Sequence, residues 1–187
     1  MTSELHHRSL VACAIGALAA LSAASALPAQ GAECAPIYAS QLKLLKTPHH
    51  GYSVDSSAVG ARLHQGQATT SESIMTGEAI YTLYKGSWRR SPASVEDMQK
   101  QEEENIKNAK STCAVAGMES VNGEAATVYQ VHSVTDFGTS DARQWVSKSR
   151  GLPLRTVMRL DAGGAMGKSI MVMHYDYSNV AAPAGVQ

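Results

Sequence analysis

Residues 144–177 read QWVSKSRGLPLRTVMRLDAGGAMGKSIMVMHYDY and contain three short runs rich in β-branched and aromatic residues. Arg150-Gly151 separates the first run from the second, and the glycine-rich segment 161–167 separates the second from the third. Glycine tolerates the positive φ of tight turns, whereas valine, threonine, tyrosine and tryptophan favour strands. The pattern therefore predicts three consecutive antiparallel strands. Nothing in it is typical of a reacting group.

More strands are expected upstream of this meander. Asn122-Gly123 is a strong signal for a two-residue hairpin turn, because both residues tolerate positive φ. Lys85-Gly86-Ser87 indicates a second hairpin, with Trp88 on its returning strand. Residues 51–67 alternate only weakly and are expected to be irregular or an edge strand. The upstream strands are expected at 73–76, 78–84, 113–121 and 124–134.

Two helices are expected. Residues 35–47 contain Pro36, which suits a first helical turn, and place apolar residues near one face. Residues 95–110 follow Ser94, and Asp97 stands three positions later, which approximates a capping box. The apolar stripe of this second helix is narrow, so most of its surface should be solvated.

The chain has 187 residues and is expected to form one domain after removal of a leader. Residues 1–26 have the pattern of a signal peptide, with cleavage between 26 and 33, since Arg8 precedes an apolar run too short to span a bilayer. The domain is expected at 33–180, with a flexible tail at 181–187. This organisation predicts a periplasmic or secreted protein without a transmembrane segment.

Removing the leader leaves two cysteines, Cys34 and Cys113. In an oxidising compartment two remaining thiols usually pair, and neither cysteine has further metal ligands at short spacing. A disulfide between Cys34 and Cys113 is therefore expected. Sixteen basic residues balance sixteen acidic ones, so the broad positive field that attracts nucleic acid is absent.

Several strands are apolar at both odd and even positions, so both faces of the sheet need cover. A strongly curved sheet with two helices over its concave side would meet this need, and its interior could hold an apolar ligand. Methionine suits such a cavity because its side chain is flexible and polarizable, although it also fills ordinary cores. The candidate ligand-binding residues are Tyr81, Tyr129, Trp145, Met158, Met171, Met173 and Tyr175.

A known family shares some of these features. The residues concerned are Trp145-Val146-Ser147, Gly151-Leu152-Pro153-Leu154-Arg155 and Tyr175-Asp176-Tyr177-Ser178-Asn179-Val180. This series resembles the LolA-like periplasmic lipoprotein-carrier superfamily, most strongly over 113–180. The resemblance implies a mainly β (α+β) fold: an open antiparallel half-barrel with two helices as a lid, which holds lipid or acyl chains. The chain departs from the family in its short mature length and its irregular amino-terminal half.

Other motifs have simpler explanations. Residues 162–169 imitate a phosphate-binding loop but lack its first glycine and the helix that should follow. His49-His50 would point to opposite faces of a strand, so no metal site is expected. We therefore expect a non-enzymatic, monomeric carrier or binder of a lipid, an acyl chain or a lipoprotein, which needs no cofactor and binds no nucleic acid. The alternative is an exported protein-interaction module with a filled core.

Overall fold

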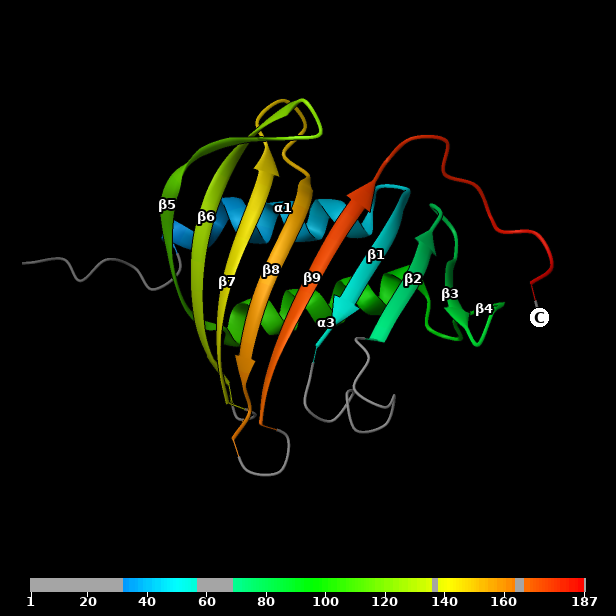
Figure 1. The fold of residues 1–187 in the computed structure, drawn as a ribbon, viewed down its shortest axis with the longest axis horizontal. Helices are drawn as coiled ribbons and strands as arrows, with labels where there is room; N and C mark the ends of the chain where they lie inside the picture. Colours follow the sequence, from blue (N-terminus) through cyan, green and yellow to red (C-terminus); the bar gives the residue numbers. More distant parts are fainter. Residues whose placement is uncertain (1–31, 57–68, 136–137, 164–166, 187) are drawn as a thin grey trace, which may run out of the picture.

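The computed structural model describes residues 32–56, 69–135, 138–163 and 167–186. Within these ranges the chain forms one nine-stranded sheet in which all neighbouring strands are antiparallel. The order is β4-β3-β2-β1-β9-β8-β7-β6-β5, and the edge strands β4 and β5 do not pair with each other (Figure 1). The strands are β1 His49–Asp55, β2 Thr69–Met75, β3 Ile80–Tyr84, β4 Ser87–Arg90, β5 Lys110–Val121, β6 Glu124–Thr135, β7 Gly138–Ser147, β8 Pro153–Asp161 and β9 Lys168–Asp176.

The helical elements are η1 Ala32–Cys34, α1 Ala35–Leu45 and α3 Val95–Asn108. Both α-helices lie on the same side of the curved, unclosed sheet (Figure 1). This is the open, curved antiparallel sheet with two helices on one side that the sequence predicted. The predicted N-terminus of α3 is also confirmed, because the Ser94 side chain accepts a hydrogen bond from the Asp97 amide at 3.0 Å.

Two apolar clusters lie on opposite faces of the sheet, as the apolar residues at both parities predicted. The cluster under α1 consists of Cys34, Ile37, Cys113 and Val146. The other consists of Ala126, Val128, Trp145 and Leu154. The predicted disulfide between Cys34 and Cys113 is present and connects the start of α1 to the edge strand β5.

One expectation is wrong. The part of 51–67 that the structure describes is neither irregular nor an edge, because β1 lies inside the sheet between β2 and β9. Its sequence, HHGYSVD, has few apolar residues. Pairing with β9, more than a hundred residues away in the chain, therefore determines its position, and local propensity has little weight there.

The expected leader lies outside the described residues, and so does most of 51–67. Neither helix in the described ranges has the length and the apolar character that a membrane crossing demands.

Candidate functional site

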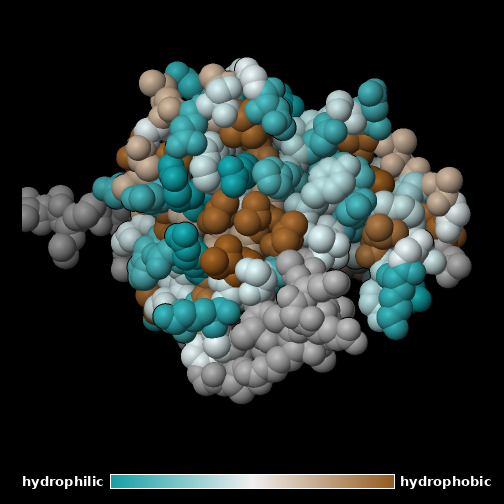
Figure 2. All heavy atoms as spheres, in the orientation of Figure 1, coloured by the Kyte–Doolittle hydropathy of each residue, from teal (hydrophilic) through white to brown (hydrophobic). Residues whose placement is uncertain are grey.

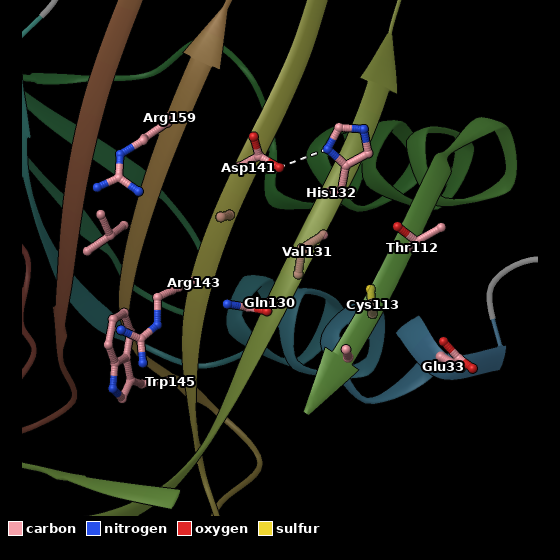
Figure 3. Close-up of a pocket in the computed structure, with 13 residues that line it drawn as sticks. Glu33, Thr112, Cys113, Gln130, Val131, His132, Asp141, Arg143, Trp145 and Arg159 are labelled. Carbon is pink, nitrogen blue, oxygen red and sulfur yellow. Dashed lines mark hydrogen bonds and ion pairs between the residues drawn. The ribbon is translucent and has the colours of Figure 1, made fainter. Parts of the chain in front are cut away.

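The two faces of the sheet differ in what covers them. On the face that we call the helix face, the Gln144 amide donates a hydrogen bond of 3.2 Å to the Ser40 hydroxyl of α1. Trp145, the next residue, points to the opposite side because side chains alternate along a strand. We call that side the open face, and it is turned toward the viewer in Figures 1–3.

Five of the seven candidate ligand-binding residues lie on the helix face. The strand register shows this, because directly paired residues share a face. Gln144 pairs with Thr156, which pairs with Met173, and in the next row Met158 pairs with Met171. The five residues are Tyr129, Met158, Met171, Met173 and Tyr175.

Met75, which pairs with His49 on this face, is buried, whereas Met158, Met171 and Met173 are only half-buried and remain partly exposed. The helix layer explains this exposure. α1 packs on β7 and β8, whereas α3 packs chiefly against α1, and none of the α3 side chains is buried. The predicted thin apolar stripe of α3 is confirmed for Val95, Met98 and Ile106, which are half-buried, whereas Ala109 follows the helix and is exposed. The cover over Met158 and Met171 is therefore loose.

One end of the methionine surface is closed by aromatic residues. The Tyr175 hydroxyl donates to Met173 Sδ at 3.6 Å, and the His49 and Tyr175 rings meet edge to face with centroids 5.8 Å apart. Burial raises the pKa of Tyr175 and lowers the pKa of His49, so both side chains are neutral at pH 7. This end of the surface is therefore uncharged at neutral pH.

The other two candidate residues, Trp145 and Tyr81, lie on the open face. Trp145 is 5% exposed, and its Nε1 donates to a Glu119 carboxylate oxygen at 2.7 Å. Tyr81 pairs with Ile74, which pairs with His50 on the open side of β1. The structure therefore divides the predicted set between two surfaces.

The open face has a hollow of about 800 Å³ over β5 to β8 (Figure 3). Trp145 is its only member from the predicted set. The His132 ring and the Asp141 carboxylate form a hydrogen bond of 2.8 Å at its upper rim, and Arg143 and Arg159 lie on one side. Sequence reasoning missed these residues. The sequence pattern that could have identified them is the alternation in 141–145 and 155–159. It places the charged side chains at odd-numbered positions, and hence on one face of the sheet.

A polar network holds the Arg150-Gly151 hairpin. The Glu124 carboxylate accepts hydrogen bonds from Arg150 Nε at 2.9 Å, from Arg150 Nη2 and from the Ser147 hydroxyl. The Arg150 guanidinium lies 4.7 Å from the Tyr177 ring centroid, and the Tyr177 hydroxyl donates to the Pro153 carbonyl. These contacts fix the turn between β7 and β8. The network has a structural role.

Replacing Glu124 by glutamine is expected to reduce the dependence of stability on acid pH. The hydrogen bonds from Arg150 hold the pKa of Glu124 below its usual value, and burial opposes this shift. A depressed folded-state pKa gives stabilisation that is complete above about pH 4.5 and is lost as the pH falls through the folded pKa. We expect Glu124→Gln to lower the free energy of unfolding by about 1 kcal/mol at pH 7, and the difference to shrink below pH 4.5.

Urea unfolding of wild type and variant between pH 3 and pH 7 measures this difference. Glu96→Gln is the matched control, because the Glu96–Lys100 pair on α3 is exposed and should contribute little. A difference for Glu124→Gln that is constant over the whole pH range would contradict the expectation.

Within the described ranges, no three histidine, cysteine, aspartate or glutamate side chains gather closely enough to hold a metal ion. No protein-family model matches the chain, and no curated protein matches it.

Solved structures with a similar fold exist at low sequence identity. Lipoprotein LppX of Mycobacterium tuberculosis is 11% identical with a TM-score of 0.49, over 83% of this chain and 100% of that chain. A chain of the MucA/MucB complex of Pseudomonas aeruginosa is 13% identical with a TM-score of 0.46, over 80% of this chain and 59% of that chain. A putative outer membrane lipoprotein-sorting protein domain of Vibrio parahaemolyticus is 11% identical with a TM-score of 0.23, over 81% of this chain and 93% of that chain. At these identities the likeness concerns the fold alone.

Proposed function

We propose that this protein is an exported, non-catalytic carrier or binder of an apolar molecule, such as a lipid, an acyl chain or the acylated end of a lipoprotein. The ligand would lie between the helix face of the sheet and α3. The observation that supports this proposal most strongly is the exposure of Met158, Met171 and Met173 beneath a helix layer. In a filled core these side chains would be enclosed.

The properties of this surface agree with a loosely shaped apolar ligand. Methionine side chains adapt to varied partners because they are unbranched and polarizable. The neighbouring Tyr175 and His49 are uncharged at neutral pH, so no ionised group has to lose its hydration when an apolar chain enters. α3 can move with few lost contacts, because it packs on α1 and buries no side chain of its own. It is thus suited to act as a lid.

The disulfide supports export. Disulfides persist in oxidising compartments such as the periplasm and are rare in the cytosol. The Cys34–Cys113 bond also fixes the start of α1 on β5, so one end of the helix layer stays attached while α3 moves.

Replacing Met171 by glutamate is expected to weaken uptake of an apolar ligand at least about tenfold, because a carboxylate would have to lose its hydration on the contact surface. The measurement is titration of the delipidated protein with an uncharged hydrophobic dye, followed by fluorescence. Met118→Glu is the matched control, since Met118 lies on edge strand β5 and is 72% exposed. It should leave uptake unchanged.

Circular dichroism and thermal unfolding must accompany this titration. A Met171→Glu variant that folds and takes up dye like wild type would contradict the proposal. Lower stability with unchanged affinity would show that Met171 is only a core residue.

The alternative, a protein-interaction module, is favoured by one observation. The edge strand β5 exposes two large apolar side chains, Val115 at 66% and Met118 at 72%. Exposed strand edges can pair with an added strand from another protein. Native mass spectrometry of the exported protein separates the two functions: bound lipid supports the carrier, whereas lipid-free protein that loses a partner in Met118→Glu supports the module.

A further inference from the structure

Three arginines gather on the open face of the sheet, beside the hollow. Arg143 lies on β7, and Arg155 and Arg159 lie on β8. Their common side follows from the register, in which Trp145 pairs with Arg155 and Arg143 pairs with Val157. The three arginines therefore flank Val157 on the open face of the sheet.

Part of this positive charge has no acidic partner among the described residues. Arg143 Nη2 binds Glu119 at 2.9 Å. The Arg155 guanidinium lies 5.0 Å from the Trp145 ring centroid, and its buried Nε has no hydrogen-bond partner. The Arg159 residue is exposed, and no side-chain hydrogen bond or ion pair joins its guanidinium group to a described residue.

The nearest carboxylate in the strand register is already hydrogen-bonded to another side chain. Asp141 pairs with Arg159 in the strand register, but its carboxylate oxygen lies 2.8 Å from the His132 ring nitrogen. Glu33 is at the opposite side of the hollow (Figure 3). Guanidinium N–H groups are thus available on the side where Arg159 and Arg143 lie, and their planar arrangement suits a carboxylate, sulfate or phosphate.

An apolar row begins directly beside these arginines. Val157 pairs with Val172 on β9, and Val172 pairs with Val54 on β1. The row crosses two strand spacings, about 10 Å. Val54 is 41% exposed and the adjacent Ile170 is 42% exposed. Figure 2 shows apolar atoms gathered over β8, β9 and β1 with hydrophilic atoms around them.

We propose that the open face binds an anionic amphiphile, with its carboxylate, sulfate or phosphate head at Arg159 and Arg143 and its apolar chain along the row Val157–Val172–Val54. Charge complementarity selects the head, and the partly exposed apolar row selects the chain. The head would lie at the side of the hollow of about 800 Å³, whose lining includes Arg143, Arg159 and Val157, and the chain would continue outside the hollow over β9 and β1. This site goes beyond the proposed carrier function and lies on the opposite face from the methionines.

The test uses the mature protein and dodecyl phosphate below its micelle-forming concentration, with binding measured by calorimetry. In a Trp88→Phe background, Trp145 emission reports the same event, since Trp88 is the other tryptophan of the chain. We expect saturable binding that Arg159→Glu weakens at least about tenfold, because a hydrogen bond between charged groups is lost and repulsion replaces it.

Lys107→Glu is the matched control, because it makes the same charge change at an exposed position of α3 and should leave the affinity within about twofold. An Arg159→Glu variant with wild-type affinity would overturn the proposal. If inorganic phosphate bound with the same affinity as dodecyl phosphate, the apolar row would not contribute to binding. Binding to anionic vesicles without binding of the monomeric amphiphile would indicate membrane docking. Binding that Met171→Glu abolishes and Arg159→Glu preserves would place the amphiphile on the helix face.

Discussion

Replacing Trp145 by alanine is expected to lower the free energy of unfolding by about 3 to 5 kcal/mol, the usual cost of deleting a buried aromatic side chain. Trp145 is 5% exposed and packs with Ala126, Val128 and Leu154. Its ring also stacks with two guanidinium groups, and its Nε1 donates to Glu119. The substitution leaves a cavity and leaves the carboxylate and the guanidinium groups without their ring partner.

Urea unfolding of Trp145→Ala and wild type measures this loss. Trp88→Ala is the matched control, because Trp88 is half-buried on the edge strand β4 and should cost clearly less. A loss below about 1 kcal/mol for Trp145→Ala would be incompatible with its burial. Because Trp145 and Met171 lie on opposite faces, a folded Trp145→Phe variant is expected to take up the uncharged dye like wild type. Reduced dye uptake by Trp145→Phe would instead show that a change on the open face affects binding on the helix face.

Removing the disulfide is expected to have a comparable effect. The Cys34→Ser/Cys113→Ser double variant should lose about 2 to 5 kcal/mol of unfolding free energy. The bond closes a loop across 79 positions, which the chain-entropy model values at roughly 4 to 5 kcal/mol. Both cysteines are also buried, at 0% and 3% exposure, against Ile37 and Val146. Their loss would therefore loosen the contact between α1 and β5 as well.

Guanidinium unfolding with and without reductant tests this prediction. Wild type under reducing conditions should unfold at a denaturant concentration close to that of the double variant, whereas the double variant should not respond to reductant. If reductant leaves the wild-type transition unchanged although mass spectrometry shows both thiols free, the bond does not stabilise the fold.

The local elements follow from local chemistry. Ser94 starts α3 because its hydroxyl accepts a hydrogen bond from an otherwise unpaired amide at the third helical position. Asn122 and Gly123 both adopt positive φ in the hairpin between β5 and β6. The pairing of Cys34 with Cys113 could be predicted because an oxidising compartment favours disulfides and only these two cysteines remain after removal of the expected leader. The helix start and the turn depend on a few neighbouring residues, and for the disulfide only one partner was available to each cysteine.

The position of β1 could not be predicted in the same way. Its pairing with β9 joins segments more than a hundred residues apart, and a strand containing two histidines and a glycine has no local signal for a central place. The sequence also did not separate the helix face from the open face, because Met171 and Met173 alternate with the equally apolar Ile170 and Val172. When the odd-numbered and the even-numbered side chains of a strand are both apolar, the sequence does not show which set faces a helix.

By itself, the sequence determined that the chain forms an antiparallel sheet with two helices and a disulfide, and that both faces of the sheet are apolar. Only the tertiary structure decided which face α1 and α3 cover, and hence that the methionines and Trp145 belong to different surfaces. The physical reason is that the alternation of side chains along a strand divides them into two faces without showing which face a helix covers. The packing of α1 against Gln144 and Cys113 identifies the covered face. The three arginines then lie on the open face because they share the parity of Trp145.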